Sequence, residues 1–328
     1  MTDTNAKTLD YTNAKIAVGI SSCLLGERVR FDGGHKKSSY IMDTLGEYFD
    51  YRSFCPEMAI GMGVPRETIR LVKTEAANDA HRAVGVRNPD MDVTEKLIAS
   101  AHQQRHWHQD IFGYIVKKDS PSCGMERVKV YRKDSPHRNG IGLYTRTLME
   151  NFPNLPIEEE GRLGDSILRE NFIHRVFIYQ RWRLLLDSGV SIKSLTDFHA
   201  QHKYILYSHD QTAARSLGNS LSNAHKLDID EYARSYESAL MALLKKTATR
   251  KNHVNVLQHI QGYLKRDLDK DDKQELVESI DSYRLGQLPL IVPVTLLNHF
   301  FRKHPNDYIA NSYYLKPHPK ELMLLNSL

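Results

Sequence analysis

A thiol and a carboxylate lie two positions apart at Cys55 and Glu57, where an apolar pattern ends and the glycines Gly61 and Gly63 follow. A cysteine thiolate is a nucleophile and a soft metal ligand, and a carboxylate can carry a proton to or from a reacting group. The two residue types together suggest half of an active site. The other half must come from elsewhere in the chain.

Cys23 and Cys123 are the other two cysteines, and both follow an apolar run inside a turn of small residues. The runs at 15–20 and 111–116 precede Cys23 and Cys123, just as the run at 51–54 precedes Cys55. Because the carboxyl ends of parallel strands meet at one edge of a sheet, strands in these runs would bring the three thiols to one crevice. Three unrelated buried thiols are the alternative, and they have no reason to share this placement.

Cysteine number and spacing restrict the chemistry further. Three cysteines without a CxxC pair argue against a disulfide framework and against a zinc ribbon. Thiolates are the usual ligands of iron–sulfur clusters, and a cubane needs four to be saturated. A cluster on three cysteines would leave one iron open to a sulfur-bearing substrate, and Glu57 could then move protons while Ser120 or Ser122 bonds the substrate. Spacing alone does not distinguish this hypothesis from a cysteine nucleophile.

The elements that must position these residues alternate in the first half of the chain. Strands are expected at 15–20, 51–54, 68–73, 111–116 and 128–131, and helices at 38–48, 92–101 and 140–152. This order predicts an α/β domain with a mostly parallel, Rossmann-like sheet. Three histidines at the far end of the second helix (His102, His106 and His108) lack a carboxylate at ligand spacing, so a metal site there is disfavoured.

The second half of the chain has helical periodicity throughout. A long amphipathic helix at 166–186 is expected to connect the halves, followed by helices at 195–207, 228–246, 253–264, 273–285 and 290–299. We therefore predict two domains, an α/β domain over residues 1–184 (core about 15–165) and an all-α domain over 185–328. Basic residues in the second domain could contact an RNA backbone, although a solvated helix face is the alternative: Lys203, Lys245, Lys246, Arg250 and Lys251.

Composition fits this picture. The 328 residues are 41% hydrophobic and 26% charged, as in soluble globular proteins. Apolar runs are too short to span a bilayer, and the N-terminus lacks the pattern of a secretory signal, so a cytoplasmic protein is expected. The net charge of +5 permits nucleic-acid binding through local patches without arguing for it.

Five blocks of the first half resemble the thiouracil desulfidase family over roughly residues 15–165. They are Ser21-Ser22-Cys23-Leu24-Leu25-Gly26, Asp32-Gly33-Gly34-His35-Lys36, Cys55-Pro56-Glu57, Gly61-Met62-Gly63-Val64-Pro65-Arg66-Glu67 and Ser120-Pro121-Ser122-Cys123-Gly124. The resemblance implies an oxygen-sensitive [4Fe-4S] cluster on the three cysteines, with one open iron that takes sulfur from a thiolated pyrimidine. It also implies catalytic roles for Glu57 and Ser120. Ser22, Ser122 and Lys36 are further candidates for binding the substrate.

The second half resembles an all-α domain of unknown function often fused behind the desulfidase domain, through His199-xx-His202-Lys203-Tyr204 and the segment 252–264. Two-domain chains of this kind are similar to tRNA 4-thiouridine desulfidases. The resemblance implies that the helical domain holds tRNA. Two alternatives remain: a desulfidase of free 2-thiouracil or thiouridine with a regulatory or assembly role for the helices, and an RNA-binding protein whose cluster or zinc is structural.

Overall fold

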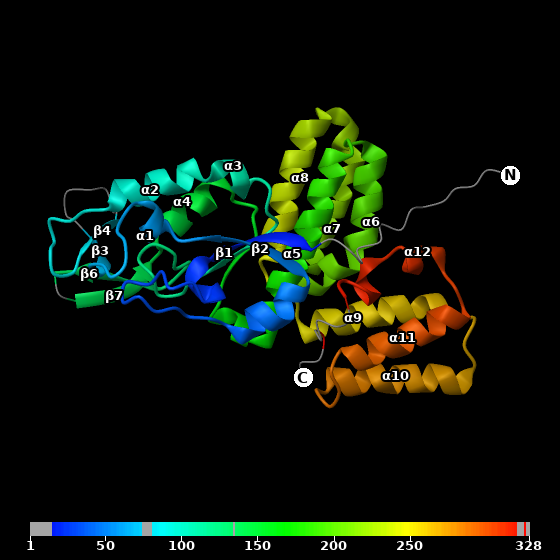
Figure 1. The fold of residues 1–328 in the computed structure, drawn as a ribbon. Helices are drawn as coiled ribbons and strands as arrows, with labels where there is room; N and C mark the ends of the chain where they lie inside the picture. The colour runs from blue at the N-terminus through cyan, green and yellow to red at the C-terminus, as the bar shows by residue number, and fades with distance from the viewer. Residues whose placement is uncertain (1–14, 74–80, 134, 320–324, 326–328) are drawn as a thin grey trace. The chain divides into compact units, whose positions relative to one another are not determined.

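The computed structural model describes residues 15–73, 81–133, 135–319 and 325. The chain divides into two compact units, Met1–Gly161 and Arg162–Leu328 (Figure 1). Within the described residues, the first unit contains both sheets and the second contains only helices, which confirms the predicted α/β and all-α regions. The long helix α5 (Ser166–Asp187) falls in the second unit, so the boundary expected after residue 184 lies inside this helix.

Four parallel strands form the first sheet, in the order β2 (Phe49–Phe54), β1 (Ile16–Ser21), β5 (Tyr114–Val116) and β8 (Ile157–Glu159). The central strand β1 is almost entirely buried, as expected for a parallel sheet covered on both faces. Its last residue, Ser21, pairs with the last residue of β2, Phe54. The strands that precede Cys23, Cys55 and Cys123 therefore end at one edge, and the predicted parallel arrangement is confirmed.

A second, mixed sheet has the order β4 (His81–Gly85), β3 (Ile69–Lys73), β6 (Val128–Arg132) and β7 (Ser135–Gly140). Strands β3 and β6 match the predicted runs, whereas β4 and β7 were not predicted. Strand β7 is exposed almost throughout, so its polar sequence has no apolar alternation. Helices α2 (Thr94–Gln103) and α4 (Leu143–Asn151) pack together (Figure 1). Leu97 of α2 and Leu143 of α4 belong to one core cluster with Leu71 and Val130 of the sheet.

Short helices connect the strands of the first unit. The helix expected over 38–48 is a π-helical turn followed by a 3-10 turn, η2 (Tyr40–Thr44) and η3 (Leu45–Glu47). The others are η1 (Ser22–Leu25), α1 (Pro56–Ala59) and α3 (Arg105–His108). The three histidines near α3 bond to separate partners, Asn151 for His102, the Gln103 carbonyl for His106 and Tyr144 for His108.

The helical unit follows the predicted order and contains two further α-helices, one of ten residues and one of four. Its helices after α5 are α6 (Ile192–His209), α7 (Gln211–Ser220), α8 (Ile229–Leu244), α9 (Arg250–Gln261), α10 (Lys270–Arg284), α11 (Ile291–Lys303) and α12 (Asp307–Ala310). The short turns η4 (Arg162–Gly164), η5 (Leu221–Lys226), η6 (Gly262–Leu264) and η7 (Tyr313–Leu315) complete it. Helix α7 was not predicted because it is rich in small and polar residues. Among the described residues, no helix is long and apolar enough to cross a membrane.

Candidate active site

A cavity of about 340 Å³ lies at the carboxyl edge of the parallel sheet, and all three cysteines line it. Glu57, Ser120, Ser22 and Lys36, which were also predicted to belong to the site, line the same cavity. The convergence expected from the strand ends is therefore present. Ser122 is fully buried behind the wall and reaches the site through hydrogen bonds.

Backbone contacts fix each thiol close to the end of its strand. Cys23 lies in η1 directly after β1, and its carbonyl accepts a hydrogen bond from the Lys36 N–H at 2.8 Å. Cys55 is the N-cap of α1, where a proline at the first helical position favours helix initiation. The Cys123 carbonyl accepts the Thr145 hydroxyl at 2.7 Å, which fixes the turn after β5 against α4.

A close approach between two backbones supports the third cysteine. A Cβ atom on Gly142 would lie 2.5 Å from the Ser122 carbonyl carbon and 2.7 Å from the Cys123 nitrogen. Real Cβ atoms do not approach backbone atoms so closely, so a side chain at position 142 would displace the Ser122–Cys123 peptide. The glycine thus lets the start of α4 pack directly against the loop that carries Cys123.

Burial makes the three thiols weak acids. It raises the pKa of Cys23 to about 11, and it also raises the pKa values of Cys55 and Cys123. Negative charge on Cys55 would raise the pKa values of Cys23 and Cys123 further. A bound metal reverses this tendency, because a coordinating thiol loses its proton outright.

The donor set fits a multi-iron cluster better than a single ion. Within the described parts of the chain, no three side chains of the His, Cys, Asp or Glu type converge closely enough to hold one ion. A single zinc requires all its sulfur ligands about 2.3 Å from a common centre. A four-iron cluster binds one thiolate per iron, so its ligands surround a volume instead of meeting at a point. Three thiols around one cavity, two of them buried and that of Cys55 partly exposed, match that requirement.

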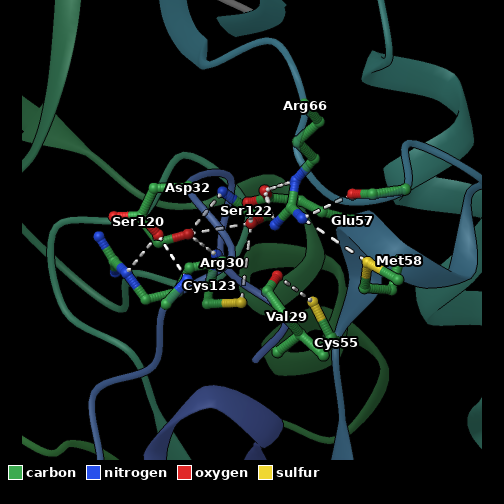
Figure 2. A network of polar contacts seen from close by, with 12 residues as sticks. Val29, Arg30, Asp32, Cys55, Glu57, Met58, Arg66, Ser120, Ser122 and Cys123 are labelled. Carbon is green, nitrogen blue, oxygen red and sulfur yellow. Dashed lines mark hydrogen bonds and ion pairs between the residues drawn. The ribbon is translucent and has the colours of Figure 1, made fainter. Parts of the chain in front are cut away.

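Glu57 lies at the centre of a polar network beside the thiols, which Figure 2 shows. Its Oε2 accepts a hydrogen bond from Arg66 Nε at 2.9 Å, and Arg66 Nη2 lies 2.7 Å from the same oxygen in an ion pair. Its Oε1 accepts the Ser122 hydroxyl at 2.5 Å. The Arg66 side chain is only 4% exposed, so this charge-assisted pair is well shielded from water.

Ser120 contacts the same network from the loop after β5. Its Oγ lies 2.9 Å from Ser122 Oγ and accepts the backbone N–H of Cys123 at 3.1 Å (Figure 2). Ser122 Oγ is also 3.7 Å from the sulfur of Cys123. Thus the two serines connect Glu57 with the third cysteine.

The remainder of the cavity wall is mixed, with basic and aromatic side chains beside the acidic Asp119 and the apolar Val29 and Ile69. Arg30 and Lys118 line the cavity beside Phe31 and Phe54, and the Arg30 guanidinium lies 5.4 Å from the centre of the Phe31 ring. Lys117 also lines it and forms an ion pair with Glu160. Aromatic rings beside cationic groups suit a planar, anionic or phosphate-bearing ligand.

The five basic residues proposed to contact RNA all lie in the helical unit, and several already have partners. Lys246 pairs with Asp210 at 2.5 Å, and the Arg250 guanidinium lies 5.7 Å from the Tyr283 ring centre. Lys203 lies over two tyrosine rings of its own helix. Lys245 and Lys251 are exposed.

Arg66 is the site residue that sequence reasoning did not assign. It belongs to the block Gly61-Met62-Gly63-Val64-Pro65-Arg66-Glu67, so the resemblance contained a signal, but nothing in that block shows that the side chain turns back to Glu57. The turn depends on backbone bonds across the loop: the Arg66 N–H donates to the Phe31 carbonyl at 3.0 Å, and Nη1 donates to the Gly63 carbonyl at 3.0 Å.

Two family models match the chain. Residues 18–160 match the family described as 2-thiouracil desulfurase, and residues 203–319 match the family described as "Protein of unknown function (DUF1722)". The first match contains every residue of the thiol cavity.

The chain is also similar to individual proteins. The chain is 30% identical to the "Uncharacterized protein YbgA" of Escherichia coli (strain K12) over 154 residues, which cover 47% of this chain and 91% of the relative. It is 30% identical to the "Uncharacterized protein YbbK" of Bacillus subtilis (strain 168) over 110 residues, which cover 32% of this chain and 71% of that relative. A solved structure named "[4Fe-4S]-dependent thiouracil desulfidase TudS" is 28% identical, covers 46% of this chain and 95% of its own, and has a TM-score of 0.38.

Proposed function

Since this chain belongs to the 2-thiouracil desulfurase family and joins that enzyme region to a DUF1722 region, we propose that it removes sulfur from 4-thiouridine in tRNA and leaves uridine. The observation that carries the proposal is the cavity in which three cysteines meet Glu57 and Ser120. The reaction exchanges one sulfur for one oxygen: the thiocarbonyl and water give a carbonyl and hydrogen sulfide. No electrons are gained or lost overall.

In this proposal Cys23, Cys55 and Cys123 hold a [4Fe-4S] cluster. When bound, the cluster supplies an iron without a cysteine ligand, and such a soft centre favours sulfur over oxygen. Glu57 accepts a proton from the attacking water and returns it to the departing sulfur. Ser120 hydrogen-bonds the substrate or the water, and Ser22 and Lys36 contact the pyrimidine or its sugar phosphate.

An RNA substrate is supported by groups in both units. Arg30, Lys36 and Lys118 give the cavity a basic wall that suits a phosphate backbone. In the helical unit, two tyrosine rings stack on each other, and two cationic side chains lie over the ring of a third tyrosine. Tyr263 stacks on Tyr308 with ring centres 5.8 Å apart, and Lys203 and Arg215 lie 5.6 and 5.8 Å from the centre of the Tyr207 ring. Aromatic rings beside cations are a common platform for single-stranded bases.

The size of the cavity favours a second candidate, a free thiolated pyrimidine. At about 340 Å³ the cavity is at the small end of ligand pockets. Because the cluster would occupy part of it, the remaining space suits one pyrimidine nucleoside at most. A nucleotide of tRNA would therefore have to be extruded from its stack to enter, at an energetic cost of a few kcal/mol. In this alternative the helical unit serves assembly or regulation.

Nucleoside analysis of tRNA incubated anaerobically with reconstituted protein tests the proposal. We expect 4-thiouridine to fall and uridine to rise. Lys203→Ala and Tyr263→Ala should each slow this reaction several-fold, while turnover of free 2-thiouracil stays unchanged. Lys193 is an exposed lysine on the same helix as Lys203, so Lys193→Ala is the matched control.

Two other results would replace the proposal. Turnover of the free base without loss of 4-thiouridine from tRNA identifies the small-molecule enzyme. Binding of tRNA without turnover of either substrate identifies an RNA-binding protein with a structural cluster.

A further inference from the structure

We infer that Arg66 and Ser122 are positioning residues that join Glu57 and Ser120 into one hydrogen-bonded unit, through which a proton passes between the cavity and Glu57. This inference rests on the proposed function, because it concerns how the same site handles the proton of the attacking water. It adds two residues to the chemistry. Ser122 does not line the cavity, whereas Arg66 does, with its guanidinium held on Glu57.

The hydrogen atoms of this network can be assigned from chemistry alone. A carboxylate only accepts, so the Ser122 hydroxyl must donate its single hydrogen to Glu57 Oε1. Ser122 Oγ then has no hydrogen left for the 2.9 Å contact with Ser120 Oγ, and Ser120 must be the donor there. The Ser120 oxygen in turn accepts the backbone N–H groups of Ser122 at 3.3 Å and Cys123 at 3.1 Å. The hydroxyls therefore point in one direction, from Ser120 through Ser122 to Glu57 (Figure 2).

Arg66 determines which carboxylate oxygen is used. Both of its N–H contacts converge on Oε2, so Oε1 is directed at Ser122. The planar guanidinium, with Nε and Nη2 both facing Oε2, defines the direction of this contact better than the single ammonium of a lysine could. The guanidinium is itself fixed by the Gly63 carbonyl at 3.0 Å.

Burial separates the roles of the two serines. Ser120 lines the cavity, whereas Ser122 is fully buried and does not. A water in the cavity can hydrogen-bond Ser120 or Glu57, which both line it, but it cannot reach Ser122. The two serines therefore provide a second route, which leads to Oε1 of Glu57. As the water attacks, one of its protons moves to Ser120 Oγ, the Ser120 proton moves to Ser122 Oγ, and the Ser122 proton moves to Glu57 Oε1. Both serines end neutral, the water has lost one proton, and Glu57 has gained it.

A double-mutant cycle on the reconstituted full chain tests the connection. Ser122→Ala should lower kcat on the order of 10²-fold, at the low end of what positioned acid–base groups contribute, with KM unchanged. In a Glu57→Gln background, Ser122→Ala should cause no further loss, because the two residues act as one unit. Ser100→Ala, which truncates another buried serine of the same unit, should leave kcat unchanged. Additive losses in the double variant, or an unchanged kcat in Ser122→Ala, overturn the inference.

Arg66 is tested by a conservative change. Arg66→Lys keeps the charge but cannot place two N–H groups on Oε2, so kcat should fall about tenfold with KM and iron content unchanged. Arg82→Lys, in an exposed pair with Asp92, is the control and should have no effect. Loss of iron from Arg66→Lys shows a structural role and overturns its assignment as a positioning residue.

Failure of this inference can be distinguished from failure of the proposed function. The double-mutant cycle and the Arg66→Lys variant are both measured with thiolated tRNA and with free 2-thiouracil. Turnover of the free base alone would reject tRNA as the substrate, but it would still show whether the residues of the network are coupled. A third measurement needs no turnover. In cluster-free protein, the urea midpoint shifts of Arg66→Met and Glu57→Gln should be non-additive when combined, and additive shifts overturn the inference.

Discussion

Arg66 places two N–H groups on a single oxygen of Glu57, at 2.9 Å from Nε and 2.7 Å from Nη2. The other carboxylate oxygen is thereby directed toward Ser122 and the loop that carries Cys123. This relationship connects the two loops that follow β2 and β5. It makes Glu57 a group of fixed orientation beside the thiols, which is what proton transfer to a bound substrate requires.

Replacing the Glu57 carboxylate with the isosteric amide should separate chemistry from cluster binding. Glu57→Gln is expected to keep about four irons per chain and the brown colour of a [4Fe-4S] protein, while kcat falls on the order of 10²- to 10⁴-fold. Iron content and loss of a thiolated pyrimidine are measured anaerobically on the same sample. Glu47→Gln, at an exposed position of η3, is the matched control. A Glu57→Gln protein without iron would show that the carboxylate is structural.

Each cysteine should be required for the cluster. Cys23→Ser, Cys55→Ser and Cys123→Ser are expected to lose both the colour and most of the iron after reconstitution, because a serine hydroxyl is a poor ligand for iron in such clusters. The absorbance of the reconstituted protein and its iron and sulfide contents check this. A variant that keeps a full complement of iron would remove that cysteine from the ligand set, and an active protein without iron would remove the cluster from the mechanism.

Gly142 provides a test of the loop geometry that is independent of the chemistry. Gly142→Ala should displace the Ser122–Cys123 peptide, since the new Cβ would lie 2.5 Å from the Ser122 carbonyl carbon. We expect reduced iron incorporation and a loss of stability of about 1–3 kcal/mol, typical of overpacking. Gly164→Ala is the control, because a Cβ there meets no atom within 4 Å. Equal iron contents in the two variants would contradict the close packing of α4 against the loop.

Acid should destabilise the helical unit. Burial lowers the pKa of His209 to about 4, whereas an unfolded chain titrates near 6.5, so between these values only the unfolded state binds the proton. Stability then falls as the pH drops from 6.5 to 4, by roughly 3 kcal/mol for this residue alone. His253 and His318 are shifted in the same direction, to about 3 and about 4. Glu170, whose pKa burial raises to about 7, acts oppositely, since its contribution is lost as the pH rises through 7.

Tryptophan fluorescence can measure this acid effect in one unit. The chain has two tryptophans, and Trp107→Phe leaves Trp182, in the core of the helical unit, as the reporter. The free energy of unfolding in urea is measured at pH 7 and at pH 5. Its decrease between these pH values should be smaller in Trp107→Phe/His209→Asn than in Trp107→Phe. The asparagine amide can still donate to the Lys246 carbonyl, as Nδ1 of His209 does at 2.6 Å, but it does not titrate. An unchanged pH dependence would show that His209 is not buried as a neutral group.

The sequence by itself determined the elements whose signal is local. The apolar runs before the cysteines became the strands β1, β2 and β5, and the amphipathic run capped by Asp165 became α5 within one residue of its predicted end. Strand β8, with three residues, and the polar strand β7 carry too little periodicity to be recognised. Convergence of the three thiols also followed, because parallel strands end at the same edge of a sheet.

Tertiary structure alone decided how the remaining groups of the site meet. Arg66 follows Glu57 by only nine positions, yet its direction is set by carbonyls of Phe31 and Gly63. Ser122 is separated from Glu57 by 65 positions, and Gly142 supports Ser122 from the start of α4. A hydrogen bond requires two atoms within about 3 Å in the correct orientation. The number of residues between two groups does not specify that distance. It is set by how the intervening segments of the chain pack.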